Sequence, residues 1–336
     1  MNEGSSVRMP AEWERHESTW ISWPKNPLTF LPHIIRKVEM TYVSIVEELS
    51  KGERVDIMVD DAAAEQRVSG ILSSTRNVAF HRILTADVWV RDYGPTFVKG
   101  NDVVATKWTF NAWGNKYDDL LPDDAAGRQM ALSTGLRVIE EKMVLEGGSI
   151  DVNGGGSLMT TEQCLLNSNR NPSLSRAQIE ENLKNRLGVE HFIWLKGGIE
   201  GDDTDGHVDD IARFVSGDTV VCMVEEDRSD ANFKPLNENL RILGNTELPG
   251  GRALRVVSLP MPEKLDDEGR LPASYANFYI GNSAVLVPVF NDRNDDAVLD
   301  ELHRHFPGRK IIGLDCRALV HGLGTIHCAT QQQPER

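Results

Sequence analysis

Hydrophobic residues recur at helical spacing in the segment 33–51, and a strand-like run follows it directly. The residues on the apolar helical face are Ile34, Val38, Tyr42, Ile45 and Leu49. Gly52 then interrupts the pattern, and RVDIMV at 54–59 has the apolar, β-branched character of a strand. This segment predicts a helix, a breaker and a strand in succession.

The same order returns along the chain. A short helix is predicted near 62–74, before strand-like NVAFHRI. Ser175 and Gln178 form a capping box at the start of a helix over 175–187, and a glycine closes that helix before VEHFIWL. A further helix near 296–305 ends at ProGly and leads into KIIGL. The recurrence indicates a chain built from similar modules.

Hairpin signals lie between these units. FYI and AVLVPVF, within 278–290, are separated by GlyAsnSer, and DVVATKWTF at 102–110 is strand-like. Antiparallel strands mixed with short helices, without a long linker, favour one α/β domain of repeated modules over residues 1–336. Sequence identity between the modules is too weak to establish a repeat by itself.

The charge of the chain narrows the class of partners. The chain has 36 basic and 51 acidic residues, a formal net charge of −15 at pH 7, which repels phosphate backbones and anionic membranes and attracts cations. Its longest apolar run, AVLVPVF at 284–290, is far shorter than the ~20 residues that span a bilayer. Residues 1–17 contain no apolar core of signal-peptide length. We expect a cytoplasmic protein that binds a small cation, with no nucleic acid or membrane partner.

The four cysteines show no CxxC spacing and are too sparse for a disulfide scaffold, so we expect free thiols. Cys222 lies in the apolar run TVVCMV and is interpreted as a core residue, as are Cys164 and Cys316. Cys328, in HGLGTIHCATQQQPER, could be a nucleophile, half of a metal site or a structural residue, and its local sequence alone favours the structural role.

One acidic stretch, DDTDGHVDD at 202–210, combines a histidine with five aspartates. Strand alternation would place His207 and Asp209 on the same side. Divalent metals accept such ligands, but no second histidine stands at HxH or HxxxH spacing and the other carboxylates are scattered. A metal site and a solvated acidic turn are both kept as alternatives for this stretch.

The pair formed by His207 and Asp209 also fits nucleophilic chemistry when joined with Asp92, Glu146 and Cys328. A nucleophilic cysteine needs a histidine to move protons, and a group that orients the histidine. Two further carboxylates would oppose thiolate formation unless the substrate is itself a cation. A guanidinium is planar, permanently charged and matched to carboxylates. Against this, Glu146 could simply decorate a turn.

The same candidates stand within longer stretches of characteristic sequence. These are MPAEWERHESTWISWP at 9–24, VWVRDYGPTFV at 88–98, FNAWG at 110–114, EGGSI at 146–150, TTEQCLLNSNRNP at 160–172, TDGHVDDIARF at 204–214 and HGLGTIHCATQQQP at 321–334. Together they resemble the agmatine deiminases and the related bacterial peptidyl-arginine deiminase family, over nearly the whole chain.

The resemblance implies a pentein-type α/β propeller of five ββαβ-like modules around a pseudo-fivefold axis. It also implies that Cys328 is the covalent nucleophile and His207 the general acid and base. Asp92 and Asp209 would hold the guanidinium, and Glu146 would support the histidine or the substrate. Such enzymes use no metal and no organic cofactor.

The implied reaction is hydrolysis of agmatine to N-carbamoylputrescine and ammonia through an amidino-cysteine. Deimination of peptidyl-arginine or free arginine is the alternative, and a non-catalytic binding member of the propeller fold is a more distant one. A homo-oligomer is compatible with the sequence. The candidate substrate-binding residues are Trp89, Trp113, Asp203 and Gly324.

The acidic run of Asp202, Asp203 and Asp205 suggests a partner for the distal amine of agmatine, where the carboxylate of arginine would be repelled. Three features depart from the family pattern, and one of them is the glycine run before the catalytic motif, which is GlyLeuGly in this chain. Asp151 stands where many agmatine deiminases have a histidine, and Asp210 where many have an asparagine. Neither is one of the five catalytic candidates, but both bear on the shape of the pocket.

Overall fold

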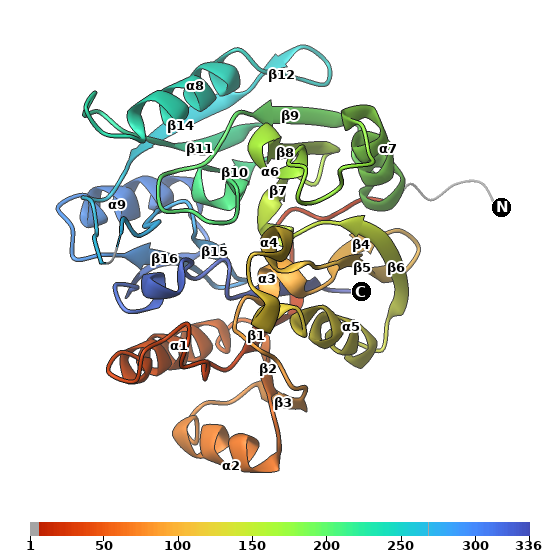
Figure 1. Ribbon diagram of the computed structural model, residues 1–336, viewed down its shortest axis with the longest axis vertical. Coiled ribbons are helices and arrows are strands. Elements are labelled where there is room, and N and C mark those ends of the chain that lie inside the picture. Colours follow the sequence, from red (N-terminus) through yellow and green to blue (C-terminus); the bar gives the residue numbers. More distant parts are fainter. Residues whose placement is uncertain (1–6, 268) are drawn as a thin grey trace.

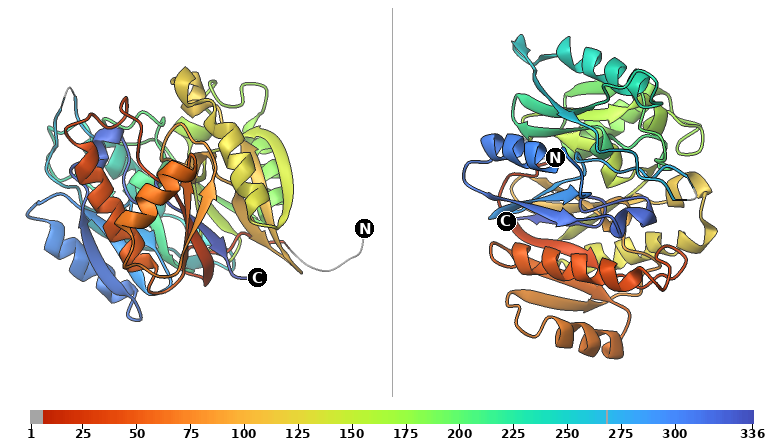
Figure 2. Two further views of the ribbon diagram at one scale, coloured as in Figure 1. Left: turned by 90° about the horizontal axis from the view of Figure 1, so that it is seen from below. Right: turned by 90° about the vertical axis from the view of Figure 1, so that its left-hand side faces the viewer.

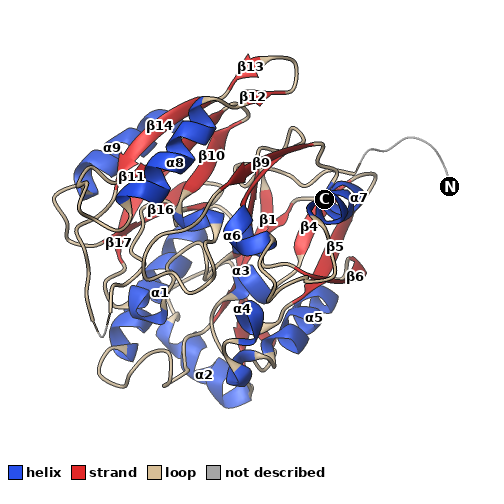
Figure 3. Cartoon of the chain, turned by 45° about the horizontal axis from the view of Figure 1, so that its top comes forward, coloured by secondary structure: helices blue, strands red, loops and turns tan. Residues whose placement is uncertain are grey.

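The computed structural model describes residues 7–267 and 269–336, which form five sheets of three or four strands around a common centre and one additional two-stranded hairpin (Figure 1). The colours of Figure 1 follow the ring in sequence order, from the red and orange first module through gold, green and teal to the blue fifth module. The long helices lie outside the strands of their own modules (Figure 3). Only residues 7–17 of the segment predicted to lack a signal-peptide core fall within the described part of the chain.

The first sheet is closed by the other end of the chain. Its strand order is β18-β1-β2-β3, with β18 antiparallel to β1 and the remaining pairs parallel. Figure 2 shows the blue C-terminal strand beside the red β1. The elements are β1 (His16–Ser22), α1 (Ile35–Leu49), β2 (Arg54–Val59), α2 (Ala62–Ile71), β3 (Val78–Arg82) and β18 (Gln331–Pro334).

The other four modules follow one rule. In each, the first and second strands are antiparallel, a helix follows, and the third strand is parallel to the second. The second module has β4 (Thr96–Lys99), β5 (Val103–Thr109), α5 (Asp123–Ser133) and β6 (Arg137–Val144). The third has β7 (Ile150–Val152), β8 (Ser157–Thr161), α6 (Glu162–Leu165), α7 (Arg176–Leu187) and β9 (His191–Leu195).

The fourth module has β10 (Ala212–Ser216), β11 (Thr219–Val224), α8 (Phe233–Gly244) and β14 (Arg255–Pro260), with a hairpin of β12 (Glu247–Leu248) and β13 (Arg252–Ala253). The fifth has β15 (Tyr279–Ile280), β16 (Ala284–Val289), α9 (Asp295–His305) and β17 (Lys310–Asp315). Four modules thus have the order ββαβ. The first has it when β18 is taken as its first strand, and α2 and β3 are additional, so the arrangement confirms the predicted α/β propeller.

Local signals in the sequence account for much of this pattern. The predicted capping box of α7 is present between Ser175 and Gln178, and Gly188 ends the helix in the left-handed conformation at φ 66°. The face of α1 that was predicted from its spacing is buried. Each helix covers its sheet with one apolar face, which is the usual way for an α/β layer to exclude water.

Short turns at the centre of the ring carry the polar residues. They are α3 (Val90–Tyr93), α4 (Ala112–Asn115), η1 (Asp118–Leu120), η2 (Gly147–Ser149), η3 (Val208–Asp210) and η4 (Leu319–Gly322). The prediction that the stretch HVD forms a strand is wrong. Asp205 and Gly206 both adopt positive φ values and turn the chain, so a single 3-10 turn follows His207. An alternation of three residues is too short to distinguish a strand from such a turn.

Two findings concern the chain as a whole. The cysteines Cys164, Cys222, Cys316 and Cys328 are buried free thiols, as predicted. Within residues 7–267 and 269–336, the helices are too short or too polar to cross a membrane.

Candidate active site

Cys328 lies in the turn between η4 and β18, at a cavity of about 330 Å³. All four residues predicted to bind substrate line this cavity together with Asp92 and Cys328: Trp89, Trp113, Asp203 and Gly324. Gly324 packs against Trp89, where a Cβ atom would come within 2.7 Å of the indole. The glycine therefore lets the backbone approach the aromatic wall beside the sulfur.

The environment of Cys328 keeps its sulfur protonated in the free enzyme. Burial raises the pKa of the thiol well above its ordinary value, and the neighbouring carboxylates of Asp209, Asp210 and Asp92 raise it further. Asn277 Nδ2 donates a hydrogen bond to Sγ at 3.1 Å, and Asp209 Oδ2 lies 3.6 Å from Sγ. A cation bound among these carboxylates would offset their charge and favour the thiolate.

His207 lies at the start of η3 and is fully buried. Its Nδ1 is 3.7 Å from Asp92 Oδ1 and 4.0 Å from Asp209 Oδ1, and neither ring nitrogen has a hydrogen-bond partner among the described residues. Burial lowers the pKa of His207, but the carboxylate of Asp92, the neighbouring Cys164 and the carboxylate of Asp209 outweigh it and raise the pKa well above its ordinary value. The imidazolium is thus available as a proton donor at neutral pH.

Asp92 belongs to α3 and is held from two sides. Trp113 Nε1 donates to Asp92 Oδ2 at 2.9 Å, and the backbone N–H of Gly148 donates to Asp92 Oδ1 at 2.9 Å. The backbone of Trp113 is left-handed at φ 52°, a conformation that costs about 1–3 kcal/mol for such a residue. Burial raises the pKa of Asp92. The strained backbone thus fixes the indole that orients the carboxylate.

Asp209 is oriented by His327, the histidine next to the cysteine. His327 Nδ1 lies 2.6 Å from Asp209 Oδ2, and His327 Nε2 lies 2.8 Å from Glu12 Oε2. Glu12 is held in turn by Arg213, whose Nη2 lies 2.9 Å from Glu12 Oε1. Burial acts to raise the pKa of Asp209, but its contact with His327 lowers the pKa below the ordinary value. Asp209 is therefore ionised beside the sulfur.

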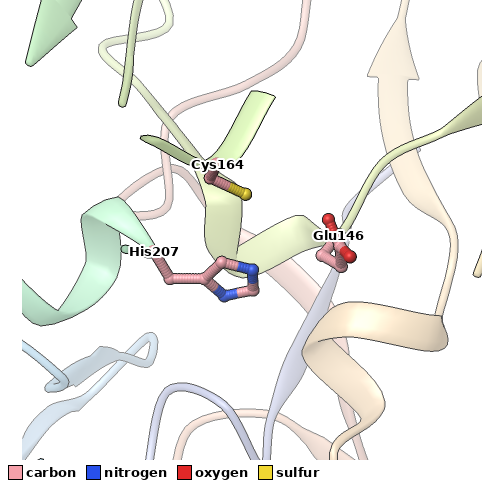
Figure 4. A group of neighbouring side chains, drawn as sticks. All are labelled: Glu146, Cys164 and His207. Carbon is pink, nitrogen blue, oxygen red and sulfur yellow. The ribbon is translucent and has the colours of Figure 1, made fainter. Parts of the chain in front are cut away.

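Glu146 precedes η2 and is fully buried against an arginine. Arg170 Nε donates to Glu146 Oε1 at 2.6 Å, and Arg170 Nη2 donates to the carbonyl of Thr204 at 2.8 Å. Figure 4 shows the carboxylate of Glu146 and the thiol of Cys164 on the same side of the His207 ring. The structure thus brings all five predicted catalytic residues to the centre of the ring.

Contrary to the prediction, the three aspartates of the acidic run 202–205 do not all face the cavity. Asp202 accepts hydrogen bonds from the backbone N–H groups of Thr204 and Gly206, at 2.7 and 2.9 Å. Asp205 accepts from Arg170 Nη1 at 2.5 Å. Only Asp203 lines the cavity, because the tight turn at these residues sends neighbouring side chains in different directions.

Two cavity carboxylates were not identified from the sequence. Asp87 and Asp119 line the cavity with Asp203. Asp87 accepts hydrogen bonds from Thr29 and from Asn26 Nδ2, which tie the loop before α1 to the cavity, and burial raises the pKa of Asp87 to about 6. Both aspartates lie in loops whose sequence carries no signal beyond polarity.

Other residues missed by sequence reasoning support the catalytic candidates indirectly. They are Glu12, Arg170, Asn277 and Arg213. Glu12, Arg170 and Arg213 stand in three of the characteristic stretches, so a charged residue within a longer motif was the available signal. Asn277, in SYANFYI, had none.

A ring of five ββαβ modules with a cysteine, a histidine and carboxylates at its centre defines a guanidine-modifying propeller. Residues 8–334 match the family model of the Porphyromonas-type peptidyl-arginine deiminases, and the chain belongs to that family. A relative from Legionella pneumophila strain Philadelphia 1, named provisionally for agmatine deiminase activity, is 37% identical over 97% of this chain and 94% of its own length.

Solved structures agree with this assignment. The agmatine deiminase of C. jejuni, in a cysteine-to-serine variant with substrate bound, superposes with a TM-score of 0.91 at 32% identity, covering 100% of this chain and 98% of that one. The agmatine deiminase of Enterococcus faecalis, described as catalysing its reaction, has a TM-score of 0.92 at 31% identity and covers 98% of this chain and 96% of that one.

Proposed function

We propose that the protein hydrolyses agmatine to N-carbamoylputrescine and ammonia. One observation carries the choice: the cavity places Cys328 and Asp92 beside further carboxylates and contains no lysine or arginine among its described lining residues. Agmatine is a dication, with a guanidinium at one end and an amine at the other. The cavity thus offers acidic groups to both ends of the substrate.

The far part of the cavity favours an amine over a carboxylate. Asp203, Asp119 and Asp87 line it, and the basic residue there, His321, lies 2.8 Å from Asp267. Free arginine would bring an α-carboxylate into this acidic surrounding, which is unfavourable. Trp89 forms an apolar wall for the carbon chain between the two cationic groups.

Substrate binding prepares the nucleophile. Asp92 and Asp209 accept hydrogen bonds from the guanidinium nitrogens and hold its carbon next to Cys328 Sγ. The bound positive charge offsets the carboxylates that raise the pKa of Cys328, so that the thiol loses its proton when substrate is present.

The chemical steps need one proton carrier. The thiolate attacks the guanidinium carbon, and a tetrahedral adduct forms. His207 Nδ1 faces this position and protonates the nitrogen that leaves as ammonia. His207 then takes a proton from water as the hydroxyl attacks the amidino carbon. Collapse of the second adduct breaks the C–S bond, releases the ureido product and regenerates the sulfur.

Glu146 and Arg170 support the same cycle from behind the histidine. No metal or organic cofactor takes part in these steps.

We further propose that residues 1–336 form one catalytic domain that works in the cytoplasm on a free small molecule, without a nucleic acid partner. Sedimentation would determine whether it assembles into a homo-oligomer.

An assay of ammonia release with agmatine, free arginine and a blocked arginyl peptide tests the proposal. Agmatine should be turned over with the highest kcat/KM, and Cys328→Ser should be inactive. Asp203→Asn should raise KM for agmatine more than it lowers kcat, while Asp300→Asn, on the exposed face of α9, should match the wild type. A preference for the peptide would overturn the choice of substrate, and a folded wild type without activity on all three would overturn the reaction.

A further inference from the structure

His207 has a second group of polar neighbours, and one of them, Cys164, takes no part in the proposed reaction. Glu146 Oε1 or Oε2, Cys164 Sγ and a ring nitrogen of His207 lie within 4.8 Å of one another, and all three side chains are fully buried. They come from three elements: the turn before η2, α6 and the start of η3. Figure 4 shows the sulfur and the carboxylate facing one nitrogen of the ring, with the other nitrogen on the opposite side.

The two ring nitrogens therefore face different partners. Nδ1 is the atom near Asp92 and Asp209, at 3.7 and 4.0 Å, so Nε2 is the nitrogen that faces Cys164. The carboxylates of Asp92 and Asp209 and the thiol of Cys164 therefore lie on opposite sides of the imidazole ring.

Several atoms of this cluster are buried without a bonding partner. Within residues 7–267 and 269–336, Glu146 Oε2 and both ring nitrogens of His207 make no hydrogen bond. Arg170 bonds Glu146 Oε1, which leaves Oε2 as the oxygen available to a ligand. A buried polar atom without a partner costs about 1–3 kcal/mol. A ligand that satisfies these atoms together would recover that free energy.

The local structure holds two of the three side chains in a fixed relation. The hydroxyl of Thr161 accepts a hydrogen bond from the backbone N–H of Cys164 at 3.1 Å. The same hydroxyl donates to the carbonyl of Gly206 at 2.7 Å, directly before His207. The buried hydroxyl of Thr161 thus links the turn that carries Cys164 to the turn that carries His207.

We propose that Glu146 Oε2, Cys164 Sγ and His207 Nε2 bind Zn²⁺, and that the bound metal inhibits the enzyme. A thiolate, an imidazole and a carboxylate are the ligand types that zinc prefers, and three protein ligands with an open fourth position are a usual zinc arrangement. Tetrahedral bond lengths place such donors about 3.3–3.6 Å apart. Side-chain shifts of about 1 Å would bring these atoms to that spacing.

Inhibition follows from the nitrogen that the metal occupies. A coordinated Nε2 has given its lone pair to zinc, so the ring can no longer alternate between imidazole and imidazolium at neutral pH. His207 Nδ1 would then neither donate to the leaving nitrogen nor accept from water. The guanidinium and the metal would also repel each other across the ring, so agmatine should compete with zinc.

The charges beside Glu146 set the strength of metal binding. The guanidinium of Arg170, 2.6 Å from Glu146, opposes the cation, while Asp205 offsets part of that charge through its own contact with Arg170.

Co²⁺ titration followed by thiolate-to-metal charge-transfer absorption tests the site without relying on turnover. The wild type should bind one Co²⁺ with this absorption, and Zn²⁺ should displace it. Cys164→Ser and Glu146→Gln should weaken binding at least tenfold. Cys328→Ser and Cys222→Ser should retain the signal, because the first thiol lies on the substrate side and the second in β11. Cys164→Ala serves as a second variant, and circular dichroism checks that each variant is folded.

The outcomes separate the proposal from its rivals. In the wild type, Zn²⁺ should inhibit agmatine turnover reversibly on chelation, and Cys164→Ser should remain active with at least tenfold lower sensitivity. Absorption that persists without Cys164 but disappears in Cys328→Ser would place the metal on the nucleophile and refute the site. Failure of both metals to bind the wild type would refute it as well. Metal binding in a protein that does not act on agmatine would leave the site intact and reject only the proposed reaction.

Discussion

His327 Nδ1 and Asp209 Oδ2 lie 2.6 Å apart, so the histidine beside the cysteine in sequence contacts a carboxylate instead of the sulfur. Its other nitrogen lies 2.8 Å from Glu12 Oε2. The two ring nitrogens of His327 thus bridge the carboxylates of Asp209 and Glu12. His327 is a positioning residue that keeps Asp209 ionised and correctly turned toward the substrate.

We predict that His327→Asn lowers kcat/KM for agmatine by roughly 10- to 100-fold, since it removes the ring that bridges two buried carboxylates. Steady-state assays would measure the loss, and His303→Asn in the exposed last turn of α9 is the matched control. The acidic limb of the pH profile should shift upward in the variant because Asp209 loses the contact that lowers its pKa. An unchanged profile would show that His327 only fills space.

The adjacent residues Asp209 and Asp210 should respond differently to replacement by asparagine. Asp209 has a lowered pKa, whereas burial and the neighbouring Asp209 raise the pKa of Asp210 well above its ordinary value. Asp209→Asn should lose roughly 10- to 100-fold in kcat/KM, because it removes a charge-assisted contact to the guanidinium. Asp210→Asn should keep most of its activity, since an amide oxygen can still accept from Asn277 Nδ2, now 3.1 Å away. Equal losses in the two variants would contradict this assignment.

Cys328 should discriminate between neutral and cationic alkylating reagents. Its raised pKa makes the free thiol slow toward iodoacetamide at pH 7, with a rate that increases as the pH rises. Chloroacetamidine, which carries an amidinium, should react at least about tenfold faster at pH 7, because its charge offsets the surrounding carboxylates. Mass spectrometry would locate the label, with Cys328→Ser as the blank. Faster labelling by the neutral reagent would argue against activation by a bound cation.

Gly148 should tolerate no side chain. A Cβ atom there would lie 2.6 Å from His207 Nδ1, 2.9 Å from Asp92 Oδ1 and 3.0 Å from Asp209 Oδ2. Gly148→Ala should therefore lose at least about 100-fold in kcat, as displacements of about 1 Å commonly do at a reacting centre. Gly217→Ala, where a Cβ atom would meet nothing within 4 Å, should behave as the wild type. Near-normal turnover by Gly148→Ala in a thermally stable protein would mean that the three polar groups do not meet at the substrate.

Asp123, at the start of α5, makes a pH-dependent contribution to stability. Burial raises its pKa to about 7, although the backbone N–H groups of Ala86 and Asp87 donate to it. A carboxyl whose pKa is higher in the folded than in the unfolded chain stabilises fully at low pH and loses that effect as the pH rises through its folded value. Relative to Asp123→Asn, the free energy of unfolding of the wild type should fall by up to about 4 kcal/mol between about pH 4 and pH 7.

Urea unfolding at several pH values would measure this difference, with Asp300→Asn on the exposed face of α9 as the control. A difference that stays constant with pH would show that Asp123 ionises equally in both states.

The modules could be predicted from sequence because each is encoded locally. Helical spacing, a breaker and an apolar strand lie within a few dozen residues, and the capping box of α7 marks its start at Ser175. The ring closure could not be predicted in this way. β18 is the polar run QQQP, and its place depends on β1, with Trp20 Nε1 donating to Gln333 Oε1 at 3.0 Å across the whole chain.

The residues of the site also differ in whether the sequence could predict them. Cys328, His207 and the carboxylates stand in stretches that resemble a known family, so their gathering could be expected from the sequence. Glu12 and Asn277 have roles that arise only from partners more than 50 residues away, at His327 and Cys328. A single sequence contains no direct signal for such pairs.

The closure of the first sheet by β18 has a consequence for truncated forms of the protein. The nucleophile precedes β18 by three residues, and Glu12, which holds His327, belongs to the opposite end of the chain. A chain that stops before residue 328 keeps the turns that carry Asp92, Glu146 and Asp209 but lacks both the sulfur and the strand that pairs with β1. One truncation therefore removes the nucleophile and opens the first sheet together, so such chains should be both unstable and inert.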